Sequence, residues 1–173
     1  YPDHPDAPFV QDKIVQAHDR NRDFEQAAVA RDRLNTEYAE GSAWQTKNID
    51  NPEAVKEAAN LTQRSLYSAA LFHHKQAQIH KEAEKIDLAK EEYGVAANAY
   101  GEYLRRFPHD KQLYDLTFYY AECLYYSLQF DRAAQHYEQV RDAGEAKFLK
   151  DAAFSTVLSY ENAIKLAEVN GTL

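Results

Sequence analysis

Three side chains in the middle of the chain, His73, His80 and Glu84, have residue types that could hold a metal ion. In a helix, their offsets would bring all three close to one line along its surface. Zinc is bound by such imidazole and carboxylate groups, but two helical turns, about 10.5 Å, separate the two histidines, which is too far for one ion. Only His80 and Glu84 could share a metal, and they would need further ligands. We therefore expect a solvated polar face, and keep a metal-dependent enzyme at His80 and Glu84 as an alternative.

The single cysteine, Cys123, follows Glu122 and has no histidine or basic residue beside it in the sequence. A nucleophilic thiolate needs a positive neighbour or a metal that lowers its pKa. We therefore interpret Cys123 as a small buried side chain. The sequence also contains no glycine-rich phosphate loop, no Gly-x-Ser-x-Gly and no His-Glu-x-x-His motif. These observations favour a protein that is not an enzyme and that needs neither a cofactor nor a metal.

The composition favours an all-α fold. Long stretches are rich in Ala, Glu, Lys, Gln and Arg, and no segment alternates like a strand. The 13 tyrosines suit thin helical layers, because the ring can be buried while the hydroxyl contacts water. A net charge of −8 argues against a nucleic-acid partner. Direct membrane insertion is not expected either, because no apolar run approaches roughly 18 residues.

Prolines and glycines divide the chain into segments. Residues 1–8 contain three prolines and predict a non-helical linker, because the residue before a proline disfavours helix. Residues 9–76 predict an N-terminal helical hairpin and the start of a long helix, which begins at Pro52 and continues for roughly 35 residues. Repeated helical hairpins are predicted for residues 77–147, and a capping helix with a tail for residues 148–173. The absence of methionine leads us to expect a piece of a longer protein.

One pattern of aromatic, small, aromatic and apolar residues occurs twice, 37 residues apart: Tyr93, Ala96, Tyr100 and Tyr103, then Phe130, Ala133, Tyr137 and Val140. The spacing is one stripe of an α-helix, and its recurrence indicates stacked helical hairpins. Ala121 and Leu124 precede the second copy, and Pro108 follows the first. A weaker third copy has an arginine in place of one aromatic: Phe24, Ala27, Arg31 and Leu34. Together these residues resemble the tetratricopeptide repeat (TPR), which implies a solenoid of helical hairpins that binds other proteins.

In that family the first helices of the repeats line a concave groove. Carried over residue by residue, the resemblance implies these partner-binding side chains: Gln78, Lys81, Lys85, Asp115, Phe118, Glu122, Tyr125 and Tyr126. Rings flanked by charges suit an extended or helical peptide. Phe118 and Glu122 replace the lysine and asparagine of the family's carboxylate clamp, so binding of chaperone tails is not expected. Packing of Tyr125 and Tyr126 on the long helix is the alternative interpretation.

We therefore expect a non-catalytic protein–protein interaction module, an adaptor or scaffold that binds a protein or peptide partner in its groove. The chain is similar to TPR proteins of the bacterial cell envelope, which implies a periplasmic or envelope-associated location. A second hypothesis is structural, namely self-association into a homo-oligomer through the long helix. An exposed apolar stripe along residues 66–86 would support that hypothesis.

Overall fold

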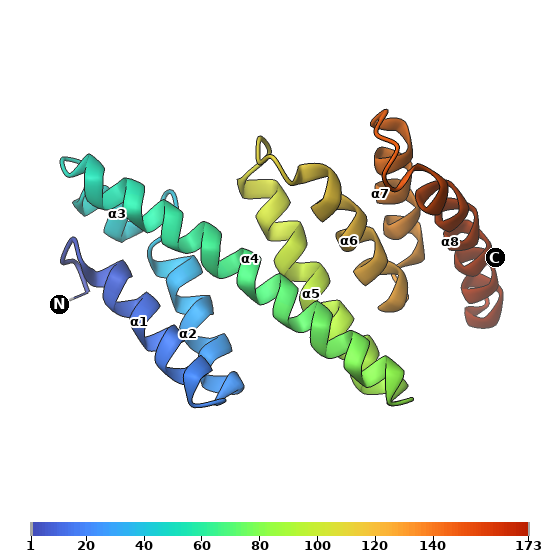
Figure 1. The fold of residues 1–173 in the computed structure, drawn as a ribbon, viewed down its shortest axis with the longest axis horizontal. Helices are drawn as coiled ribbons and strands as arrows, with labels where there is room; N and C mark the ends of the chain where they lie inside the picture. Colours follow the sequence, from blue (N-terminus) through green and yellow to red (C-terminus); the bar gives the residue numbers. More distant parts are fainter. Residues whose placement is uncertain (1, 173) are drawn as a thin grey trace. The chain divides into compact units, whose positions relative to one another are not determined.

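The computed structural model describes residues 2–172, and within that range the only regular elements are helices (Figure 1). Their bounds are α1 (Ala7–Arg20), α2 (Phe24–Glu37), α3 (Ala43–Lys47), α4 (Pro52–Glu82), α5 (Ile86–Arg106), α6 (Leu113–Tyr126), α7 (Phe130–Asp142) and α8 (Leu149–Asn170). The predicted all-α class is confirmed. The chain divides into two compact units, unit 1 (Tyr1–Ala69) and unit 2 (Ala70–Leu173), and α4 contributes residues to both.

Unit 1 is built around a small core that contains an aromatic pair. Trp44 on α3 meets Tyr38 edge to face, with 5.7 Å between the ring centroids. The same buried cluster contains Leu34 of α2 together with Ala58 and Leu61 of α4. The short helix α3, which the sequence analysis did not predict, therefore has a clear function in packing, because it places the only tryptophan in this core.

The N-terminal residues belong to unit 1. α1 begins at Ala7 rather than at the predicted Phe9, because Pro8 lies in the first helical turn, where no backbone N–H is needed. Before the helix, the carbonyl of His4 accepts a 2.9 Å hydrogen bond from Trp44 Nε1, and the Asp3 carboxylate lies 2.6 Å from the Lys47 amine. Residues 2–6 are therefore non-helical, as predicted, although they pack on α3, whereas residues 7 and 8 belong to α1.

The long helix α4 is shorter than predicted, because it ends at Glu82. Glu84 has a left-handed backbone with a φ of 59°, and the Lys85 N–H donates a 2.9 Å hydrogen bond to the His80 carbonyl. Glu84 has thus left the helix, and the predicted one-turn spacing of His80 and Glu84 on one face is wrong. His73 pairs instead with Glu92, with 2.6 Å between Nδ1 and the carboxylate. Nowhere in residues 2–172 do three His, Cys, Asp or Glu side chains form a group that could hold a metal.

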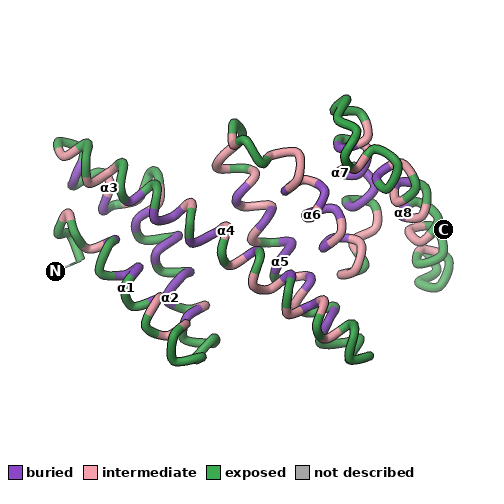
Figure 2. The backbone as a smooth tube through the Cα atoms, in the orientation of Figure 1, coloured by how far each residue is buried: buried purple, intermediate pink, exposed green. Residues whose placement is uncertain are grey.

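The apolar stripe that would support self-association through α4 is interrupted. Leu66 is buried, whereas Leu71 and Ile79 are exposed at positions eight residues apart. Ile86 belongs to the next helix, α5. Exposed residues therefore alternate with buried ones along α4 (Figure 2).

Unit 2 contains the end of α4 and the helices α5 to α8, of which each packs on the next from α5 onward. Small side chains allow this close packing, and several alanines are completely buried: Ala96, Ala121, Ala133, Ala134 and Ala152. The predicted repeated stripe lies in this core. Its eight members are buried except Phe130, which is half-buried.

Gly101 marks a very close approach between α5 and α6. A Cβ atom at this position would lie 2.9 Å from the Tyr120 hydroxyl oxygen and 3.1 Å from Cζ of the same ring. The Tyr120 side chain is buried, and its hydroxyl accepts a 2.5 Å hydrogen bond from Arg132. We expect Gly101→Ala to lower the free energy of unfolding by about 1–2 kcal/mol, because overpacking outweighs the better helix propensity of alanine.

Gly94 on the same helix is the matched control. A Cβ atom there would meet only the Ser127 Cβ, at the ordinary distance of 3.9 Å. Gly94→Ala should therefore stabilise the protein by about 0.5–1 kcal/mol. Urea denaturation of the two variants measures both effects, and stabilisation by Gly101→Ala would contradict the close packing of Tyr120.

Candidate partner-binding site

The predicted partner-binding residues all lie in unit 2, on three elements. Gln78 and Lys81 are on α4, and Lys85 is exposed in the turn before α5. The other five are on α6, and the two halves of this helix have different surroundings. The N-terminal half is covered by the segment that connects α7 to α8, and the C-terminal half is not.

Phe118, in the N-terminal half of α6, is a core residue. Its ring stacks on Phe148, with 4.1 Å between centroids and an interplanar angle of 3°. The Tyr114 hydroxyl holds the connecting segment in place, because it accepts a 3.0 Å hydrogen bond from the Phe148 N–H and lies 3.0 Å from the Glu145 carbonyl, to which it donates. Asp115 forms an ion pair with Lys147 of the same segment. Phe118 is therefore buried within unit 2, and Asp115 is held by Lys147 of the same unit.

Tyr126, in the C-terminal half of α6, is half-buried between two other helices. Its ring stacks on Tyr93 of α5 with 4.9 Å between centroids, and the Lys81 amine of α4 lies 3.6 Å from its centroid. Tyr125 contacts Tyr126 edge to face at 5.3 Å, and its hydroxyl accepts a 2.8 Å hydrogen bond from Asn162 of α8. Of the two tyrosines that the alternative interpretation packs on the long helix, Tyr126 contacts it through Lys81, whereas Tyr125 contacts α8. Both tyrosines are half-buried.

Glu122 lies one turn before Tyr126, and its side chain is half-buried. Within the described chain, its carboxylate makes no hydrogen bond and no ion pair. Burial raises the pKa of Glu122 to about 7, against the opposing effect of the positive charge of Lys81 and with a smaller contribution from Asp151. Glu122 is therefore able either to take up a proton near neutral pH or to receive a cation.

Gln78 is engaged with the core of unit 2. Its amide lies 3.3 Å from Nε2 of His74, and the other nitrogen of this buried imidazole lies 3.2 Å from the Tyr100 hydroxyl. Burial lowers the pKa of His74 to about 4, with a smaller effect from Lys75. His74 is thus a neutral structural residue, and Gln78 is only partly available to a partner.

The accessible set, which we call the α6 site, combines four predicted residues with two from α8: Lys81, Glu122, Tyr125, Tyr126, Asp151 and Asn162. Asp151 and Asn162 were missed because the last helix was interpreted only as a cap. Their separation of eleven residues, about three helical turns, places them on one face of α8 and could have revealed them. Cys123, next to Glu122, is completely buried, as predicted. Burial raises the pKa of its thiol well above the ordinary value.

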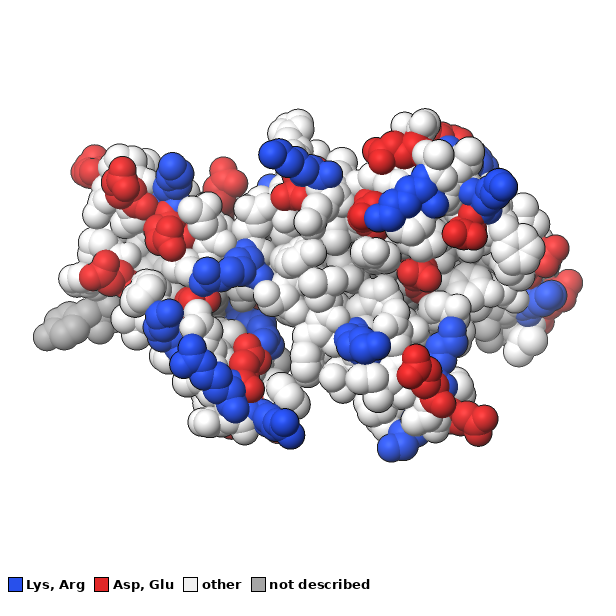
Figure 3. Space-filling model, viewed as in Figure 1, with Lys and Arg blue, Asp and Glu red and all other residues white. Residues whose placement is uncertain are grey.

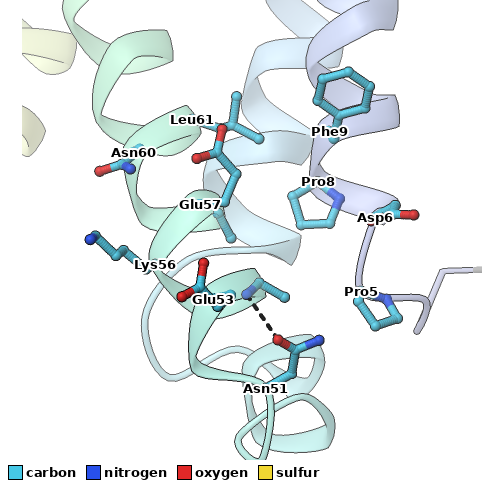
Figure 4. Close-up of a pocket in the computed structure, with 12 residues that line it drawn as sticks. Pro5, Asp6, Pro8, Phe9, Asn51, Glu53, Lys56, Glu57, Asn60 and Leu61 are labelled. Atoms are coloured by element: carbon cyan, nitrogen blue, oxygen red, sulfur yellow. Dashed lines mark hydrogen bonds between the residues drawn. The ribbon is translucent and has the colours of Figure 1, made fainter.

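Unit 1 contains a separate cavity of about 510 Å³ between the starts of α1 and α4 (Figure 4). Its apolar lining includes Pro8, Phe9 and Leu61, and two carboxylates of α4, Glu53 and Glu57, border it. Glu53 lies in the first turn of α4, where the positive N-terminal end of the helix stabilises a carboxylate. Glu57 lies one turn further along and is exposed, so neither carboxylate requires a ligand.

No family model matches the chain, and no curated protein or solved structure matches it either. The function of the α6 site must therefore be argued from its own side chains. Acidic and basic residues are mixed over the face shown in Figure 3. None of the helices in residues 2–172 has both the length and the apolar character needed to cross a membrane.

Proposed function

We propose that the chain is a non-catalytic protein–protein interaction module, a helical-repeat adaptor of the TPR kind that binds a segment of a partner protein at the α6 site. The observation that carries this proposal is the unpaired, half-buried carboxylate of Glu122 beside the half-buried rings of Tyr125 and Tyr126. A carboxylate taken out of water without a partner costs free energy. A binding function explains why this unfavourable carboxylate is present, because a partner would place a positive charge in direct contact with Glu122.

The chemistry of the α6 site indicates what the partner segment carries. Glu122 and the nearby charge of Asp151 favour a lysine or arginine side chain. Tyr125 and Tyr126 offer contact area at a low cost in side-chain entropy, and Lys81 lies on the Tyr126 ring and fixes its position. The net charge of −8 supports a protein rather than a nucleic acid as the partner. The resemblance to bacterial envelope TPR proteins supports a place in an envelope or periplasmic complex.

A peptide-display selection against the whole chain tests this proposal. We expect enriched peptides to combine a lysine or arginine with aromatic or aliphatic residues, and to bind with micromolar dissociation constants. Glu122→Gln should weaken the binding of a synthetic enriched peptide by at least about tenfold, because a charge-assisted contact is lost.

The matched control is Glu91→Gln, which removes an exposed carboxylate from α5. Binding to this variant should equal binding to the wild type. Enriched peptides that bind the Glu122→Gln variant as tightly as the wild type would place the binding surface elsewhere. A selection that enriches no peptide family would count against the adaptor function itself.

A further inference from the structure

The last helix, α8, carries an apolar stripe that unit 2 leaves uncovered. The exposed fractions are 59% for Val157, 53% for Ile164 and 41% for Tyr160, and Figure 2 shows α8 exposed along much of its length. The helix packs on α7, to which the Tyr160 hydroxyl donates a hydrogen bond at Glu138. Val157 and Ile164 project away from the buried Ala152 and Ser159. Large apolar side chains that gather on one side of a helix indicate an interaction surface.

The stripe has the spacing of a seam between two paired helices. Its members recur in alternating steps of four and three residues: Ala153, Val157, Tyr160, Ile164 and Ala167. The three central residues are exposed, and the two alanines at the ends are half-buried. This is the spacing of the core positions of a coiled coil. The seam covers about four helical turns, or roughly 21 Å. Lys150 lies just before the seam and Glu168 just after it, and both are exposed.

We propose that this stripe, which we call the α8 seam, binds the same seam of a second copy of the chain in an antiparallel, twofold-symmetric dimer. With Val157 opposite the second copy's Tyr160, Ile164 lies opposite its Ala153. The same register brings Lys150 beside the second copy's Glu168, and symmetry repeats this contact at the other end.

Charge is the reason for choosing a second copy in this orientation. A parallel pair would place Lys150 beside Lys150 and Glu168 beside Glu168, and like charges in contact are unfavourable. The antiparallel pair converts both repulsions into attractions. Each α8 helix therefore has a positive charge at one end and a negative charge at the other, and these charges pair in an antiparallel dimer.

The α8 seam is distinct from the α6 site. Asn162, which contacts Tyr125, lies five residues from Val157 and two from Ile164. At about 100° per residue, it projects from the other side of α8. The dimer thus leaves both α6 sites free and presents two of them, which would strengthen binding to a partner with repeated segments. The proposal does not depend on the function proposed for the α6 site.

Sedimentation velocity over about 2–200 µM protein tests the dimer. A seam of this length buries an area at the small end of the range for protein–protein interfaces, and we therefore expect a dissociation constant in the micromolar range. We expect the wild type to shift from monomer to dimer across this range. The double variant Val157→Glu/Ile164→Glu should remain monomeric, with dimerisation weakened by at least about a hundredfold. Val169→Glu is the matched control, because Val169 is 84% exposed on the same helix but lies outside the seam.

A charge exchange tests the orientation. Lys150→Glu and Glu168→Lys should each weaken the dimer, and the double exchange should restore it, because the opposite charges then face each other again. A wild type that stays monomeric at about 200 µM would overturn the proposal. The α8 seam would then be a binding surface for a different protein. A dimer that survives Val157→Glu/Ile164→Glu would also overturn it. Circular dichroism and melting temperature must show that every variant remains folded.

Discussion

Replacing Phe118 by alanine is expected to lower the free energy of unfolding by about 3–5 kcal/mol, as for other large aromatic residues in protein cores. Phe118 is only 8% exposed. It stacks on Phe148 at 4.1 Å and meets Tyr137 edge to face at 5.7 Å. Its removal leaves a cavity that the surrounding rings of two helices and the connecting segment cannot fill by small movements. Chemical denaturation monitored by circular dichroism measures the loss.

Two further variants show whether this loss comes from the stacked pair. Phe154→Ala removes a ring that is 68% exposed, and at low micromolar concentration it should change the free energy of unfolding by less than about 0.5 kcal/mol. A double-mutant cycle of Phe118→Ala and Phe148→Ala should give a coupling of about 0.5–1.5 kcal/mol. If the Phe118→Ala variant were as stable as the wild type, Phe118 could not be a core residue. Its predicted position on the partner-binding surface would then be correct.

The repeated stripe explains why the all-α class could be predicted from the sequence. Residues such as Ala133 and Tyr137 are buried at the spacing that the pattern requires, so helical periodicity predicted both the helices and their core faces. This signal is local, because each helix shows its own buried side in its own sequence.

Two errors in the helix bounds occur where the local backbone conformation, rather than the residue type, decides where a helix begins or ends. α4 ends without a glycine or proline, because Glu84 adopts a left-handed backbone conformation that non-glycine residues rarely take. Pro8 was interpreted as a helix breaker, although the first turn of a helix tolerates it. In both places the residue type alone did not determine the backbone.

The predicted site residues differ in their surroundings for a separate reason. Tyr126 and Lys81 come from different helices and lie in contact. Phe118 has the same helical spacing as they do, but a connecting segment covers it through Phe148 and the Tyr114 hydroxyl. Whether an aromatic residue on a predicted groove is free or covered depends on contacts with residues thirty positions away, and no periodicity within α6 contains that information.

Glu122→Gln is expected to stabilise the protein at pH 8 by roughly 3 kcal/mol, and to have almost no effect at pH 4. In the folded protein, burial raises the pKa of Glu122 from its ordinary 4.5 to about 7. Below pH 4.5 the carboxyl is protonated in both the folded and the unfolded chain, so it contributes no cost. As the pH rises from 4.5 to 7, the unfolded chain ionises first, and stability falls. Above pH 7 the folded protein bears the full cost of an ionised, half-buried carboxylate.

The comparison with the wild type isolates this effect from that of His74, which acts in the opposite direction. The pKa of His74 in the folded protein is lowered to about 4, so stability falls as the pH drops from about 6.5 toward 4, while the unfolded chain takes up the proton. Both proteins contain His74, and its contribution cancels in their difference. Urea denaturation at several pH values should therefore show the advantage of Glu122→Gln growing between pH 4.5 and 7, while the Glu91→Gln control shows no such trend. A difference that does not change with pH would mean that the Glu122 carboxylate is well solvated, and the argument for a missing cationic partner would fail with it.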